Sequence, residues 1–146
     1  MVDCIAVSRE VTYDEGRNVA PEAAATASSG DPTGAAKGCV DGLREWTAKG
    51  TTGEWIRLEW AQATKTIHRV VLYDRANSKD QVASGTLSFS DGSFMPVGRL
   101  QNDGQAGTVV TFPAKKIQWV RFTIDAVRPG TENGGLGEME VYAKAD

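Results

Sequence analysis

Hydrophobic and polar side chains alternate along the segment 67–93, and this pattern is the clearest structural signal in the chain. Val70 and Leu72 alternate with outward-facing positions, and the residues 86–90 (TLSFS) alternate between polar and apolar side chains. A repeat of two residues is typical of a β-strand with one buried face. The residues 74–83 between the two patterns are polar and loop-like, so the segment predicts a strand, a loop and a second strand.

The same alternation recurs on both sides of this segment. In 54–60 (EWIRLEW), every second side chain is apolar and lies on one face. We predict further strands over 23–28, 94–100, 119–125, 138–142 and 108–112, the last of them closed by Pro113, with 4–11 as an edge strand or leader. About seven or eight short strands without a helix predict an all-β fold, a sandwich of two antiparallel sheets.

The composition fits a single globular domain. The 146 residues divide into an N-terminal leader or edge strand over 1–17 and the sandwich over 18–146. The net charge of −3 argues against nucleic acid as a partner, because nucleic-acid recognition requires a basic face. No apolar run approaches the ~18 residues of a transmembrane helix. No signal peptide opens the sequence, so we expect any such signal to be absent or removed.

The cysteines leave two alternatives open. Cys4 and Cys39 would form one disulfide that pins the N-terminal segment if the protein is exported. Two buried free thiols are an equal alternative. Their spacing matches no zinc pattern, since the chain has no second cysteine pair and one histidine.

The sequence does not predict an enzyme. One histidine and two cysteines supply neither a Ser-His-Asp nor a Cys-His set, and His68 on a predicted strand is expected to be a packed residue. Glu138 and Glu140 occupy alternate positions of one strand, and such carboxylates make no acid/base pair without a cleft. We therefore expect a binding function.

The loop that follows the central strand is the first candidate for binding. Loops on a rigid β scaffold commonly carry binding groups, and this one holds a dense set of hydrogen-bonding side chains, namely Arg75, Asn77, Lys79, Asp80 and Gln81. A guanidinium donates hydrogen bonds in a fixed fork, and a carboxylate accepts two hydroxyl protons. The alternative is that Arg75 and Asp80 pair with each other across their own loop.

Several short motifs occur along the chain in a characteristic order. They are VDG at 40–42 with Trp46 closing its loop, EWIRLEW at 54–60, VVLYDR at 70–75, SFSDG at 88–92, WVR at 119–121 and EMEVY at 138–142. This order resembles the discoidin superfamily, which includes the coagulation-factor type C domains and the family 32 carbohydrate-binding modules. The resemblance covers residues 18–143 and implies a galactose-binding-like, jelly-roll type β-sandwich.

The resemblance also implies a sugar site. In carbohydrate-binding members, an arginine after the central strand and an amide five residues later hold the hydroxyl groups of a sugar, and the corresponding positions here are Arg75 and Asp80. An aromatic side chain usually stacks on the sugar, for which Trp46 is the first candidate and Phe94 the second; core packing is the alternative for Trp46. The candidate ligand-binding residues are therefore Arg75, Asp80, Asn77, Trp46 and Glu45.

A structural calcium ion is a further implication of the resemblance. Members commonly bind calcium between the DG loop and the last strand. In this chain, Asp41 and Glu138 occupy the positions of the two side-chain ligands. Backbone carbonyls of Gly38, Leu43 and Glu45 would complete an oxygen shell, which is what calcium prefers. The alternative is that Asp41 and Glu138 are surface carboxylates.

We expect a non-catalytic, lectin-like carbohydrate-binding module. The resemblance implies a secreted or extracellular accessory domain of a larger glycan-active protein, with a glycan or polysaccharide as ligand and a catalytic domain as neighbour. The alternatives are a protein- or phospholipid-binding adhesion domain and a purely structural accessory domain. The polar loops GDPTGAAKG, DRANSKDQ and RPGTENGG argue against membrane insertion.

Overall fold

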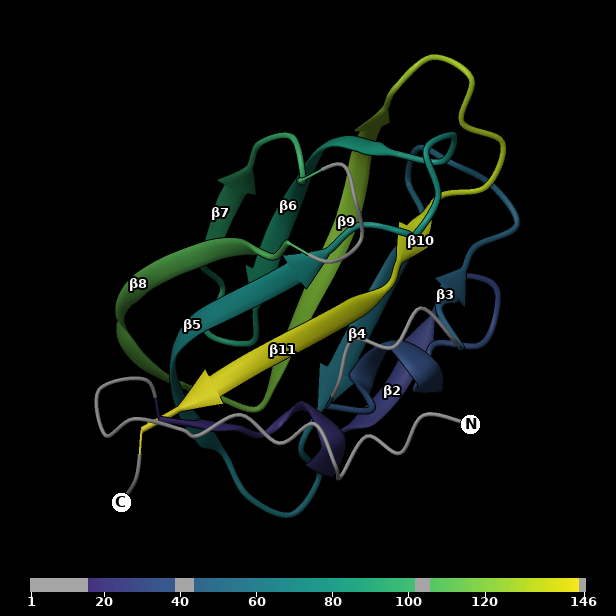
Figure 1. The fold of residues 1–146 in the computed structure, drawn as a ribbon. Helices are drawn as coiled ribbons and strands as arrows, with labels where there is room; N and C mark the ends of the chain where they lie inside the picture. The colour runs from purple at the N-terminus through teal and green to yellow at the C-terminus, as the bar shows by residue number, and fades with distance from the viewer. Residues whose placement is uncertain (1–15, 39–43, 102–105, 145–146) are drawn as a thin grey trace.

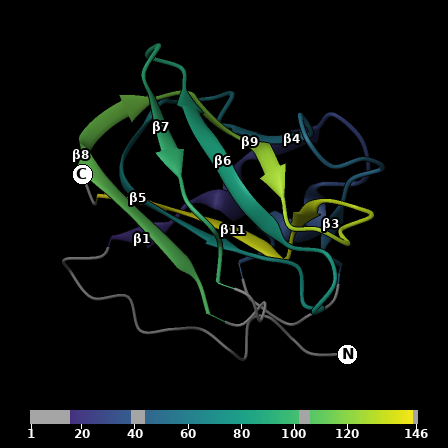
Figure 2. The same ribbon diagram turned by 90° about the horizontal axis from the view of Figure 1, so that it is seen from above.

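The computed structural model describes residues 16–38, 44–101 and 106–144, and it folds as two facing antiparallel sheets (Figures 1 and 2). The four-stranded sheet has the order β1 (Arg17–Asn18), β11 (Glu138–Ala143), β5 (Lys65–Tyr73) and β8 (Thr108–Ile117). The five-stranded sheet has the order β2 (Ala24–Ala27), β4 (Trp55–Glu59), β9 (Trp119–Val127), β6 (Val82–Phe89) and β7 (Phe94–Val97). The predicted all-β sandwich is confirmed.

Alternating side chains build the core between the two sheets. Ile56 and Leu58 of β4 lie opposite Phe122 and Val120 of β9, and all four side chains are fully buried. Val70, Leu72, Met139 and Val141 of the other sheet belong to the same hydrophobic cluster. The inward faces predicted from the period of two residues are therefore confirmed, because apolar burial selects the register of each strand.

Two predicted strands end three or more residues away from their predicted ends. β8 does not stop at Pro113 but continues to Ile117. A proline is tolerated there because β8 is the edge strand of its sheet, and because the register between β5 and β8 shifts along their length. β7 is shorter than predicted and ends at Val97, just before Gly98. The predicted strand over 4–11 lies outside the described residues.

Four short elements outside the main alternation were not predicted. The 3-10 helices η2 (Ala20–Glu22) and η3 (Thr33–Ala36) precede a small ribbon of β3 (Trp46–Thr47) and β10 (Gly135–Leu136). These segments are too short to show a period. In the described part of the chain, no helix has the length and hydrophobicity needed to cross a membrane.

Candidate functional site

Loops from distant parts of the chain meet at one end of the sandwich (Figure 1). The β3–β10 ribbon pairs Trp46 with Leu136, and the N–H of Gly134 donates to the carbonyl of Gly50 at 2.8 Å. These bonds hold the segment after β3 against the segment before β10. The loop between β5 and β6 lies at the same end, so its polar side chains face those of the other two loops.

Arg75 joins these loops. Its Nε donates to Oε1 of Glu45 at 3.2 Å, and its Nη1 donates to Oδ2 of Asp80 at 2.8 Å and to the carbonyl of Asn133 at 3.1 Å. The side chain of Arg75 is 15% exposed, and those of its two carboxylate partners are 13% and 12% exposed. The pairing of Arg75 with Asp80 across their loop, which was the alternative to a ligand site, is therefore present.

The remaining polar groups of this loop hold backbone. Oδ1 of Asp80 accepts hydrogen bonds from the N–H groups of Glu132 (2.9 Å) and Asn133 (3.3 Å). Oδ1 of Asn77 accepts from the N–H groups of Lys79 (2.9 Å) and Asp80 (2.7 Å), which is an Asx-type turn. The geometry assigns both side chains a part in shaping the loop, and their contact with a ligand stays a prediction.

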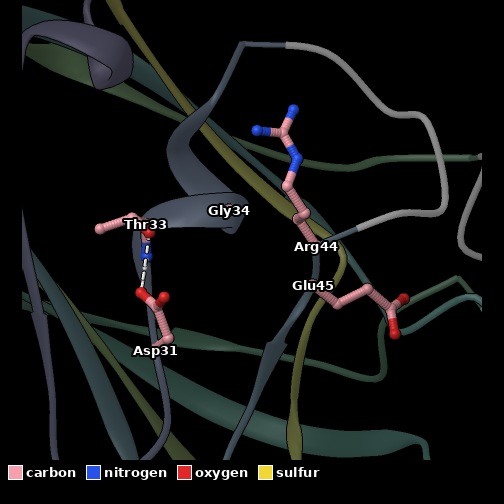
Figure 3. A pocket seen from close by; sticks show the side chains of 5 residues that line it. All are labelled: Asp31, Thr33, Gly34, Arg44 and Glu45. Carbon is pink, nitrogen blue, oxygen red and sulfur yellow. Dashed lines mark hydrogen bonds between the residues drawn. The ribbon is translucent and has the colours of Figure 1, made fainter. Parts of the chain in front are cut away.

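A hollow of about 280 Å³ lies next to this network. Figure 3 shows the residues that line it, which are Asp31, Thr33, Gly34, Arg44 and Glu45. Oδ1 of Asp31 accepts from the backbone N–H of Thr33 at 3.0 Å and from its hydroxyl at 2.7 Å, and these bonds lower the pKa of the Asp31 carboxyl. Because Glu45 contacts Arg75 and also lines the hollow, the hollow and the Arg75 network form one site.

Backbone geometry sets the shape of this hollow. Gly34 lies so close to the neighbouring loop that a Cβ atom on it would come within 1.7 Å of the carbonyl oxygen of Arg44. Arg44 itself has a φ of 52°, a left-handed conformation that is uncommon for a residue other than glycine. Its side chain and that of Glu45 leave the backbone in different directions (Figure 3).

The predicted aromatic platform is wrong. Trp46 is fully buried, and its indole Nε1 donates to the carbonyl of Ser29 at 2.8 Å. A fully buried ring offers no face to a sugar, so the core alternative holds for this residue. Phe94 is 71% exposed but lies beside the β6–β7 turn, at the opposite end of β6 from the Arg75 loop. Neither aromatic side chain accompanies Arg75.

A buried carboxyl group connects the two ends of this loop. Asp74 is 1% exposed and accepts hydrogen bonds from the N–H groups of Arg75 (2.9 Å) and Val82 (3.1 Å). Burial raises the pKa of Asp74 to about 7, against the effect of these hydrogen bonds. The proton on this group therefore couples the stability of the loop to pH.

We expect the stability of the wild type to fall relative to that of an Asp74→Asn variant as the pH rises from 5 to 8. Above the ordinary pKa of 3.8 the native state binds more protons at Asp74 than the unfolded state does, so each rise in pH toward about 7 favours unfolding. The difference in the free energy of unfolding should change by about 2 kcal/mol. Urea unfolding of both proteins at the two pH values measures it.

The matched control is Asp91→Asn. Hydrogen bonds from Ser93 lower the pKa of Asp91, so it titrates below this pH range and the difference from the wild type should stay constant. If the free energies of unfolding of the wild type and Asp74→Asn change equally between the two pH values, the raised pKa of Asp74 is contradicted.

Three of the residues expected to bind calcium, Gly38, Glu45 and Glu138, lie within the described part of the chain, and they do not form an open oxygen shell. Glu138 is fully buried, its Oε2 accepts from the N–H of Gly38 at 2.8 Å, and the ammonium of Lys37 lies 3.6 Å from its Oε1. Burial raises the pKa of Glu138, while Lys37 opposes the shift. Asp41 and Leu43 lie outside the described residues, and the described residues 16–38, 44–101 and 106–144 hold no cluster of three or more metal-binding side chains.

These groups fit an ammonium better than a calcium ion. Oε2 of Glu138 accepts the N–H of Gly38, while Oε1 has no hydrogen-bond partner among the described residues and faces the ammonium of Lys37 at 3.6 Å. Both oxygens of Glu45 accept hydrogen bonds, one from Arg75 and one from the N–H of Ala76. Because Asp41 and Leu43 lie outside the described residues, the calcium ion itself stays a prediction.

Comparison with known families shows which family the chain belongs to. Residues 18–142 match the family described as Domain of unknown function (DUF7402). The chain belongs to this family. No curated protein matches it.

Solved structures show which fold this DUF7402 domain has. It is similar to chitosan-binding module 1 of a chitosanase/glucanase from Paenibacillus sp. IK-5, with 26% identity, a TM-score of 0.67, and coverage of 87% of this chain and 99% of that one. It is also similar to a family 32 carbohydrate-binding module of C. perfringens NanJ (15% identity, TM-score 0.67, 84% and 95% covered). A fucose-binding module of Streptococcus pneumoniae matches at 19% identity, with a TM-score of 0.70 and 88% and 99% covered. The discoidin-type, galactose-binding-like fold is confirmed.

Sequence reasoning missed most of the hollow in this DUF7402 domain. Glu45 was among the predicted residues, but Asp31, Thr33, Gly34 and Arg44 were not. The pattern Asp-x-Thr at 31–33 is a recognisable turn signal, because an aspartate side chain commonly bonds the backbone two residues on. Nothing in the sequence near Arg44 signals that its loop faces that turn.

Proposed function

We propose that this protein is a non-catalytic carbohydrate-binding module, and that its glycan site is the hollow beside the Arg75 network. The single observation that carries this proposal is the hollow itself, whose lining combines carboxylates, a hydroxyl and a guanidinium. Sugar hydroxyl groups both donate and accept hydrogen bonds, so a lining of mixed donors and acceptors suits them.

The similar structures support the same ligand class. They are a chitosan-binding module, a module in complex with galactose and a fucose-binding module. These ligands share pyranose rings with several hydroxyl groups, although they differ in charge. We infer that the present chain also takes a glycan, and that it acts as an extracellular accessory module beside a catalytic domain of a larger protein.

Arg75 has a double part in this proposal. It holds Glu45 in position at the edge of the hollow, and among the described contacts none involves its Nη2. Two N–H groups on this nitrogen are therefore available to a sugar. Asp80 fixes the guanidinium plane from the other side, so its contribution to binding is through Arg75.

A glycan array followed by calorimetric titration tests the proposal, with chitosan oligosaccharides, galactosides and fucosides among the probes. We expect binding by the wild type and a loss of affinity of about tenfold in Asp31→Asn, because the substitution removes a charged acceptor and keeps its turn-forming oxygen. The signal should not change when the protein is incubated with the glycans for hours, since no bond is cleaved.

The matched control is again Asp91→Asn. Asp91 makes the same pair of hydrogen bonds, to the N–H and the hydroxyl of Ser93, but at the β6–β7 turn, at the far end of β6 from the loop that bears Arg75. Its affinity should equal that of the wild type. Absence of binding to any glycan, with the protein folded, would reject the proposal and favour a protein-binding or structural accessory domain.

A further inference from the structure

The side chain of Lys37 ends in a cage of oxygen atoms. Its Nζ donates to the carbonyl of Gly34 at 2.7 Å and lies 3.5 Å from the carbonyl of Gly137. Oε1 of Glu138 lies 3.6 Å from the same nitrogen. Backbone carbonyls plus one carboxylate oxygen are also the ligand set that a calcium ion takes in proteins.

This cage lies where the discoidin resemblance implies a metal. Lys37 and Gly38 lie three to four residues before Asp41 of the DG motif at 41–42, and Glu138 opens the last strand, β11. The lysine side chain is only 7% exposed and that of Glu138 is fully buried. The ammonium of Lys37 and the carboxyl of Glu138 therefore lie next to each other inside the protein.

Calcium and this ammonium exclude each other. A calcium ion bound to Oε1 of Glu138 would lie about 2.3–2.6 Å from that oxygen, within a few ångströms of the Lys37 Nζ. Repulsion between two cations at such a distance is strong in a buried setting, where water screens little. Lys37 would have to leave its carbonyl partners before a metal could enter.

We propose that the Lys37 ammonium takes the place at Glu138 that the resemblance gives to calcium, so that this chain carries its structural cation as a side chain. The ammonium joins the segment after η3 to the start of β11 and lies against the buried carboxyl of Glu138. The proposal does not depend on the glycan site, since it concerns the stability of the domain.

Thermal unfolding of the whole chain, after chelation and then with excess calcium chloride, tests the proposal without any variant. We expect the midpoint Tm to change by less than about 1 °C. A calcium site filled at a hundred times its Kd would instead raise the Tm by roughly 8 °C. A rise of that size in the wild type would overturn the proposal.

A pair of variants tests the role of the lysine itself. Lys37→Met keeps the length of the side chain but removes its charge, and we expect the Tm to fall by about 6 °C, because Glu138 remains buried without a cation. Adding Glu138→Gln to it should recover most of that loss. If the decreases in Tm of the two substitutions simply add, or if Lys37→Met is as stable as the wild type, the ammonium does not stabilise the buried Glu138.

The matched control is Lys79→Met. Lys79 also pairs with a glutamate, since its Nζ lies 2.6 Å from Oε1 of Glu132, but the two side chains are 56% and 70% exposed. We expect a change of less than about 2 °C, because exposed ion pairs contribute little.

Discussion

Replacing Trp46 by alanine should lower the free energy of unfolding by about 4 kcal/mol, in the range typical of deleting a large aromatic side chain from a core. Trp46 is fully buried, and its removal leaves a cavity where β3 meets the core. The substitution also leaves the carbonyl of Ser29 without its indole donor. Equilibrium unfolding in urea measures the loss.

Trp46→Phe separates packing from ligand contact. Phenylalanine keeps most of the apolar volume, so the variant should fold and lose less stability than Trp46→Ala. Because the ring lies in the core, this variant should bind a glycan as the wild type does. A folded Trp46→Phe protein that has lost glycan binding would restore the aromatic platform that the burial of Trp46 argues against.

Replacing Arg75 by methionine should lower the free energy of unfolding by about 3 kcal/mol and weaken glycan binding as well. Methionine preserves the apolar stem but leaves the carboxylates of Glu45 and Asp80, each nearly buried, without a shared cation. The carbonyl of Asn133 also loses its donor. Both effects follow from one cause, since Arg75 holds three loops together.

Arg57→Met is the matched control for this substitution. Arg57 also pairs with a glutamate, at 2.8 Å from Oε1 of Glu59, but these side chains are 33% and 38% exposed on the outer face of the five-stranded sheet. We expect a loss below about 1 kcal/mol. If Arg75→Met and Arg57→Met lower the free energy of unfolding equally, the contacts of Arg75 with the three loops do not stabilise the domain as we expect.

Alternation alone determined the layers of the fold. The inward side chains of β4, β5, β6, β9 and β11 could be predicted because a period of two residues is a local property. The burial of all six residues of β11 could not be predicted from that period. The turn at Asp91-Gly92 was equally local, and Gly92 has the left-handed φ of 90° that such a turn favours. The ends of the strands are less local. Whether Pro113 ends β8 depends on the position of that strand in the sheet, and the proline is tolerated because β8 lies at an edge.

The site was decided by contacts between segments that are far apart in sequence. Trp46 and Phe94 look alike as exposed aromatic candidates, and only the packing of β3 on the core distinguishes them. The sequence placed Arg75 and Asp80 on one loop, but the participation of Glu45 and Asn133 depends on how three loops close on one another. No local pattern carries that information.

The amino-acid sequence by itself determined the sandwich, its buried faces and the loop that bears Arg75. Tertiary structure alone brought Lys37 to Glu138, about a hundred residues apart in the chain, and formed the hollow between the 31–34 turn and Arg44. The physical reason is that burial of alternate side chains is encoded strand by strand. The partners of a charged or polar group are instead fixed only when the sheets have closed and the loops have met.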